Sequence, residues 1–158
     1  MPNRIIYCWD TSVLTAWIKG EDTAPLGDIG LIVDEIDTGK AALLISVTTI
    51  TEMLEGKFTS EQWSQLEQFQ KRSNIIMANV TPQLAYNASI IRNNALADGR
   101  KLRTPDAQII ATAIFYKAIA LHSLDPHQLN LNGTNIVDGL CIIKPISCSG
   151  SKWLNGLD

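Results

Sequence analysis

The sequence predicts a single α/β domain with a mostly parallel central sheet and helices on both faces of that sheet. Short apolar runs alternate with helical patterns along the chain, which is typical of parallel strands joined by crossover helices. The chain has 158 residues, enough for one substantial hydrophobic core. Hydrophobic residues make up 46% of it and charged residues 18%, which favours a compact domain over a disordered chain.

The expected elements follow from these patterns in chain order. Strands are expected at the short apolar runs, which are residues 4–9, 42–46, 75–80, 119–122 and 140–144. Helices are expected where apolar residues recur every three or four positions, at residues 12–19, 26–37, 47–56, 60–71, 82–97 and 105–117. Thr81 and Thr104 each precede a proline, and a capping hydroxyl followed by proline marks a helix start.

One domain is expected over residues 1–146, followed by a Ser/Gly-rich tail at residues 147–158 that packs loosely. The N-terminus passes directly into a strand without the pattern of a signal peptide, and no apolar run approaches the roughly 20 residues that span a bilayer. The cysteines are odd in number and form no C-x-x-C pair, which fits free thiols. We therefore expect a cytoplasmic protein with no membrane segment.

Aspartates at element junctions are the first candidates for a functional site. Asp10 and Asp125 each follow an apolar run directly, which places them at the carboxyl ends of parallel strands, where ligands bind. Asp10 could instead cap the next helix, although Thr11 or Ser12 could also provide the cap. Asp125 could instead form a turn with Pro126.

Asp106 and Glu52 occupy helices near the same sheet edge. Asp106 precedes an apolar helix stripe by three to four residues, so it points toward the sheet, where an unpaired carboxylate needs a partner or a metal. Its position in the first helical turn would also suit an exposed acid that faces the helix dipole. Glu52 lies away from the apolar side of its helix, where a solvated glutamate is the default, but it follows the strand at 42–46 closely. Carboxylates gathered in one cleft would suit a hard cation.

Several motifs resemble those of the PIN-domain ribonucleases, especially the VapC-type toxins of toxin–antitoxin pairs. Residues 10–14 are similar to the family's D-[TS]-S-x-[LI], residues 46–52 to its S-x-x-T-x-x-E, and residues 106–113 to its D-A-x-I-A-A-x-A helix. Residues 123–125 resemble the closing [ST]-x-D, and residues 139–145 resemble the final G-[LV]-x-[VI]-x-x-P strand. The order and spacing of these motifs cover nearly the whole chain.

The resemblance implies a PIN-like three-layer α/β/α fold and a metal-dependent endoribonuclease. It assigns Asp10, Glu52, Asp106 and Asp125 as catalytic ligands of Mg²⁺ or Mn²⁺, with Ser12 and Ser123 as supporting residues that orient carboxylates or waters. It also implies a small antitoxin as partner and a homodimer. The sequence departs from the family at Pro126 and His127, where a charged or polar residue often follows the fourth acid, and at Trp9, for which core packing is expected.

Contact with RNA requires local positive charge, because the formal net charge of the chain is −3. Arg92, Arg100, Lys101 and Arg103 precede Asp106 and could bind phosphates. They could equally form a solvated loop.

Apolar side chains are also available for a dimer interface, namely Trp17, Trp63, Leu66 and Phe69. The alternative is that they complete the core of the domain itself.

Other function classes fit the sequence less well. A haloacid-dehalogenase-like phosphatase needs an acid two residues after Asp10, where Ser12 stands, and a response-regulator receiver needs an acidic pair where Asp10 stands alone. Zinc is disfavoured because His122 and His127 have no thiol placed beside them. A PIN-like interaction module that lacks catalysis remains the main alternative.

Overall fold

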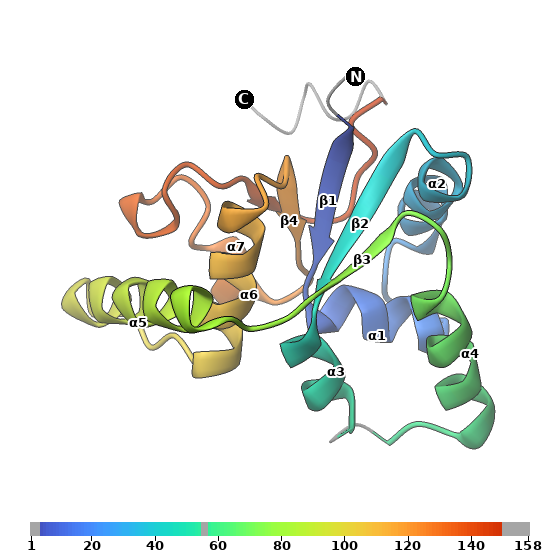
Figure 1. The fold of residues 1–158 in the computed structure, drawn as a ribbon, viewed down its shortest axis with the longest axis horizontal. Helices are drawn as coiled ribbons and strands as arrows, with labels where there is room; N and C mark the ends of the chain where they lie inside the picture. Colours follow the sequence, from blue (N-terminus) through green and yellow to red (C-terminus); the bar gives the residue numbers. More distant parts are fainter. Residues whose placement is uncertain (1–3, 55–56, 150–158) are drawn as a thin grey trace.

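The computed structural model describes residues 4–54 and 57–149, and its centre is a sheet of five parallel strands (Figure 1). The sheet order is β3-β2-β1-β4-β5. The strands are β1 (Ile5–Trp9), β2 (Ala41–Ser46), β3 (Ile75–Ala78), β4 (Ala120–His122) and β5 (Ile142–Ile143). All four strand pairs are parallel, so the mostly parallel sheet that we predicted is wholly parallel among the described residues.

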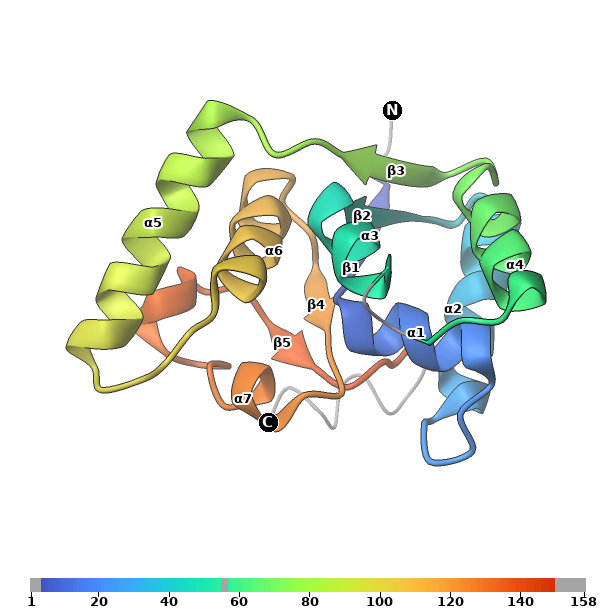
Figure 2. The same ribbon diagram turned by 90° about the horizontal axis from the view of Figure 1, so that it is seen from below.

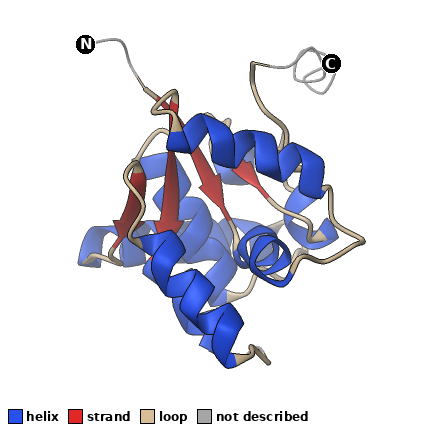
Figure 3. Cartoon of the chain, turned by 90° about the vertical axis from the view of Figure 1, so that its right-hand side faces the viewer, coloured by secondary structure: helices blue, strands red, loops and turns tan. Residues whose placement is uncertain are grey.

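Helices cover both faces of the sheet, which confirms the three-layer α/β/α architecture (Figures 2 and 3). One face carries α1 (Thr11–Lys19), α2 (Leu26–Asp37) and α4 (Ser60–Gln70), and the other carries α5 (Pro82–Ala97) and α6 (Thr104–Phe115). The shorter helix α3 (Val47–Leu54) follows β2 and contacts both α1 and α6. The remaining short helices are α7 (Pro126–Leu129) and the 3₁₀ helix η1 (Asn135–Val137).

Two apolar cores lie on opposite faces of the sheet because side chains alternate along a strand. In β1, Tyr7 and Trp9 belong to the core beneath α1, α2 and α4, and Cys8 belongs to the core beneath α5 and α6. Trp9 is fully buried and stacks on Phe69, with ring centroids 6.0 Å apart. Trp9 therefore has the packing role that was expected.

The structure corrects several sequence expectations. Leu66 and Phe69 are buried in the core of the domain, and Trp17 and Trp63 are half-buried against that core, so these four side chains do not form a surface patch. Helix α6 begins one residue earlier than predicted, with Arg103 rather than Thr104 as its cap residue. The sequence patterns did not predict α7 or η1.

The beginning of the predicted tail is packed rather than loose. The hydroxyl of Ser147 bonds to the carboxylate of Glu35, and the backbone N–H of Cys148 donates to the Tyr7 hydroxyl at 3.0 Å. Residues 150–158, the rest of that tail, lie outside the described residues, as do residues 55–56 at the predicted end of the third helix. The three cysteines are free. Among the described residues, no helix has both the length and the apolar character of a membrane span.

Candidate active site

The candidate site lies where the order of the strands reverses. From β1 the chain continues to β2 on one side, whereas β4 pairs with the other side of β1, so the carboxyl ends of β1 and β4 flank a topological switch point. Ligands of open α/β sheets bind outside such points. Asp10 directly follows β1, and Ser123, Leu124 and Asp125 directly follow β4. The Asp10 N–H donates to the His122 carbonyl at 3.1 Å and joins the two strand ends.

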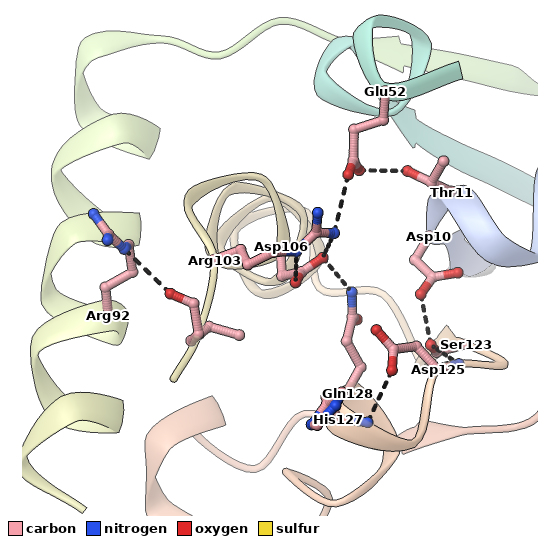
Figure 4. A network of polar contacts seen from close by, with 11 residues as sticks. Asp10, Thr11, Glu52, Arg92, Arg103, Asp106, Ser123, Asp125, His127 and Gln128 are labelled. Atoms are coloured by element: carbon pink, nitrogen blue, oxygen red, sulfur yellow. Dashed lines mark hydrogen bonds and ion pairs between the residues drawn. The ribbon is translucent and has the colours of Figure 1, made fainter. Parts of the chain in front are cut away.

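Two serines hold the Asp10 carboxylate in place. The hydroxyl of Ser12 donates to its Oδ1 and the hydroxyl of Ser123 donates to its Oδ2 (Figure 4 shows the second bond). Each hydroxyl also accepts a backbone N–H at 3.0 Å, Ser12 from Leu124 and Ser123 from Asp125. The serines thus connect Asp10 to the loop after β4.

Asp10 also caps α1, so capping and site placement are not exclusive. Its Oδ1 accepts the Val13 N–H at 3.2 Å, and neither Thr11 nor Ser12 takes the cap position. Asp10 is only 2% exposed. A carboxylate has about four acceptor sites, so Asp10 can cap the helix and still present an oxygen lone pair to a ligand.

Glu52 and Asp106 meet at Arg103 (Figure 4). Arg103 Nη2 lies 3.2 Å from Glu52 Oε2 and 3.3 Å from Asp106 Oδ1, while Arg103 Nε lies 3.2 Å from Asp106 Oδ2. The side chains of Glu52 and Asp106 are only 14% and 9% exposed, whereas that of Arg103 is 66% exposed. Thr11 adds a hydroxyl bond to Glu52 Oε1 at 2.6 Å. Glu52 is therefore not the solvated glutamate that its helix pattern alone favoured.

Gln128 is a site residue that the sequence analysis missed. Its Nε2 donates to Asp106 Oδ1 at 3.0 Å, and its buried Oε1 has no hydrogen-bond partner among the described residues. Gln128 is the third residue of α7, which Asp125 caps by accepting the His127 N–H at 2.9 Å. The spacing Asp-x-x-Gln resembles a capping box and could have predicted this short helix.

Asp106 and Asp125 line a common pocket of about 480 Å³. The cationic side chains of Arg100, Lys101 and Arg103 also line it. Its other lining residues are Gly99, Leu102, His127, Asn130 and Leu131. A volume of this size suits a small ligand or part of a larger one.

The predicted basic residues divide into two groups. Arg100 lies at the pocket, where Asp98 fixes its Nε at 2.8 Å and the Asn130 carbonyl accepts its Nη1 at 3.2 Å. Arg92 does not line the pocket: it projects from α5, and its Nε donates to the carbonyl of Leu102 at 3.3 Å (Figure 4). Arg92 thus braces the loop that carries the other three basic residues.

Burial shapes the charges of the site. Burial is the largest cause that raises the pKa of the Asp10 carboxyl to about 6, and the negative charge of Asp106 adds to it. The hydrogen bonds from Ser12, Ser123 and Val13 act in the opposite direction. The hydrogen bond to Asp106 is the largest of the causes that raise the pKa of Arg103, so the guanidinium stays charged.

His122 is a buried base beside this site. Its ring lies 5.1 Å from the Tyr7 ring, and neither ring nitrogen has a hydrogen-bond partner among the described residues. Burial lowers the His122 pKa to about 3 from the ordinary 6.5. The folded protein therefore keeps this ring neutral at pH values where the unfolded chain takes up a proton.

Replacing His122 with phenylalanine is expected to improve stability in acid relative to the wild type. The stability that neutral His122 contributes is complete above pH 6.5 and is lost as the pH falls toward 3, by about 1.4 kcal/mol per unit. Asp10 contributes a pH dependence of the unfolding free energy with the opposite sign, because its raised pKa makes the folded state more stable as the pH falls from 6 toward 3.8. The informative quantity is therefore the difference in unfolding free energy between His122→Phe and the wild type, in which the contribution of Asp10 cancels.

Urea unfolding at pH 7 and pH 5 measures that difference. The unfolding free energy of His122→Phe relative to that of the wild type should rise by about 2 kcal/mol from pH 7 to pH 5. A difference in unfolding free energy that is the same at pH 7 and pH 5 would contradict the lowered pKa of the buried His122 ring.

The donor set at the switch point fits a hard divalent cation. Asp10, Glu52, Asp106 and Asp125 offer oxygen ligands only, which Mg²⁺ and Mn²⁺ prefer. Glu52 and Asp106 already share one cation, the guanidinium of Arg103. The described part of the chain contains no group of three or more His, Cys, Asp or Glu side chains arranged for a metal ion. The guanidinium of Arg103 engages Oε2 of Glu52 and both carboxylate oxygens of Asp106.

Comparison with known proteins is consistent with this architecture. The sequence model of the PIN domain matches residues 7–133. VapBC2 from Rickettsia felis, bound to a DNA fragment from its promoter, superposes with a TM-score of 0.65 at 15% identity, over 87% of this chain and 97% of that one. VapBC-1 from nontypeable Haemophilus influenzae superposes with a TM-score of 0.64 at 17% identity, over 89% of this chain and 98% of that one. A toxin–antitoxin complex from Klebsiella pneumoniae superposes with a TM-score of 0.62 at 17% identity, over 89% of this chain and 98% of the matched chain. A search of curated proteins found no match.

Proposed function

Because the chain belongs to the PIN domain family, we propose that it is a metal-dependent endoribonuclease and the toxin of a toxin–antitoxin pair. The observation that carries this proposal is the convergence of acids at the switch point. Asp10 follows β1, Asp125 follows β4, and Glu52 and Asp106 share the guanidinium of Arg103 from two different helices. All four acids lie within the residues that match the family.

Asp10, Glu52, Asp106 and Asp125 would hold Mg²⁺ or Mn²⁺. A bound ion would supply an activated water and stabilise the negative charge that develops on the scissile phosphate. Ser12 and Ser123 orient the Asp10 carboxylate, and Gln128 orients that of Asp106. Such contacts fix the direction of ligand lone pairs and help to set metal affinity.

The pocket beside Asp106 and Asp125 would receive the RNA strand. Arg100 and Lys101 provide positive charge at its lining, next to the acids, although the whole chain is acidic. Phosphate contacts of this kind position a strand without reading its sequence. One phosphate of the RNA would thereby lie next to the carboxylates.

Cleavage of labelled RNA after removal of metals tests this function. Activity should disappear with EDTA and return with Mg²⁺ or Mn²⁺, since carboxylate oxygens bind these ions productively. Zn²⁺ alone should restore little activity. Cleavage supported only by Zn²⁺ would contradict the oxygen-ligand site, and folded protein without cleavage in any metal would favour an interaction module.

The partners proposed for the chain are a small antitoxin and a second copy of itself. Some of the structural neighbours are toxin–antitoxin complexes, which supports the first. Arg103 supplies a physical precedent, because a guanidinium already binds Glu52 and Asp106. For the homodimer, the exposed Tyr86 and Ile90, which lie four residues apart on α5, are the apolar side chains proposed for the interface.

A further inference from the structure

We propose that Arg103 alternates between two partners: the Glu52 and Asp106 carboxylates when the site holds no divalent cation, and an RNA phosphate once such a cation has displaced it. The inference rests on the proposed function and adds a role for one residue of this chain. In the first state Arg103 competes with the metal. In the second it binds substrate from the pocket that it already lines.

The hydrogen bonds of Arg103 support the first state. Its guanidinium makes three of them, two to Asp106 and one to Glu52. A planar guanidinium matches carboxylates in a forked geometry, so it can take the place of a metal ion among them. Its hydrogen bonds occupy both carboxylate oxygens of Asp106 and Oε2 of Glu52, and a cation held by these acids would compete for such oxygens. One Arg103 and one metal ion therefore cannot both hold these acids in the same way.

The position of Arg103 allows it to leave. It is the cap residue of α6, but its side chain makes no capping bond, so moving it does not disturb the helix. Its side chain is 66% exposed, so solvent screens its charge and can hydrate the guanidinium when it leaves the two carboxylates. Among the described residues, its guanidinium hydrogen bonds go to these two acids alone. Of its two partners, Asp106 is buried and Glu52 is half-buried.

The charges favour the exchange once metal is available. A divalent cation places two positive charges where the guanidinium placed one, and it repels the nearby arginine. The pocket next to Asp106 already holds Arg100 and Lys101 in its lining. A phosphate bound there would supply the negative charge that the displaced guanidinium loses. Metal binding would therefore release Arg103 from the carboxylates and allow it to bind an RNA phosphate.

Replacing Arg103 with glutamine should shift two affinities in opposite directions. Mn²⁺ titrated into metal-free protein in a calorimeter should bind about tenfold more tightly to the variant, because the competing cation is gone. At saturating Mn²⁺, the KM for RNA should rise about tenfold, because one phosphate contact is lost. A residue with a merely structural role would not move the two quantities in opposite directions.

Arg72→Gln is the matched control, because Arg72 is another exposed arginine paired with a carboxylate, that of Asp37, at 3.2 Å and outside the site. Its Mn²⁺ affinity and KM should equal those of the wild type. If the wild type binds Mn²⁺ and Arg103→Gln binds it no more tightly, the exchange is wrong while the metal site stands. If the wild type and both variants bind no Mn²⁺, the proposed function itself fails and the inference fails with it.

Discussion

Replacing Asp106 with asparagine should abolish metal-dependent RNA cleavage, lowering kcat/KM on the order of 10³-fold or more while leaving the fold intact. Asparagine has nearly the same shape but lacks the negative charge that binds a cation. Gln128 donates to Asp106, and the asparagine carbonyl can still accept that bond. The substitution also removes a negative charge near the buried Asp10, which offsets the loss of the Arg103 pair. The unfolding free energy should therefore change by only about 1 kcal/mol.

Steady-state cleavage with Mn²⁺ and urea unfolding measure the two effects of Asp106→Asn. Asp37→Asn is the matched control, because Asp37 is an acid paired with an arginine outside the site. It should retain wild-type cleavage. An Asp106→Asn protein that cleaves RNA as fast as the wild type would show that Asp106 holds no catalytic cation.

The second large effect is inhibition by the antitoxin. Its C-terminal segment should block the cleft with an arginine that pairs with Glu52 and Asp106, because Arg103 shows that a guanidinium fits these carboxylates. One equivalent of antitoxin should remove nearly all cleavage. Because the arginine and the metal compete for the same oxygens, excess Mn²⁺ should restore part of the activity.

Titration of the purified protein with the product of any small gene that lies beside its own measures this inhibition. Light scattering before the titration gives the oligomeric state, for which a homodimer is expected. A strictly monomeric protein at micromolar concentration would contradict the dimer. Absence of inhibition by that product would contradict the antitoxin model, and inhibition that Mn²⁺ does not relieve would contradict the arginine mechanism.

The sequence predicted those parts of the fold and site that depend on local pattern. The run that ends at Trp9 predicted β1 and therefore the position of Asp10 at a strand end. The apolar stripe of α6 predicted that Asp106 faces inward, and it is 6% exposed. The hydroxyls of Ser12 and Ser123 were expected to orient carboxylates, and both bond to Asp10. For Asp10 and Asp106 the local pattern of the element predicts the position of the side chain, whereas the roles of the two serines were implied by the family resemblance.

The contacts that the sequence did not predict depend on tertiary placement. The Arg103–Glu52 ion pair joins residues 51 positions apart, and it forms only because α3 and α6 meet beside the sheet. Helix α7 has four residues, too few to show a helical period, so Gln128 was not recognised. The apolar residues of α4 had the right spacing for either a core or an interface, and burial of Leu66 and Phe69 decided between them.

The chemical nature of the new RNA ends tests the central claim most directly. If a water that is activated at the acidic cluster attacks the phosphate, cleavage needs no 2′-hydroxyl nucleophile. Mass spectrometry of the products formed with Mn²⁺ should then find a linear phosphate monoester at one new end, a hydroxyl at the other and no 2′,3′-cyclic phosphate. A cyclic phosphate product, formed equally well in EDTA, would contradict metal-dependent hydrolysis by this protein.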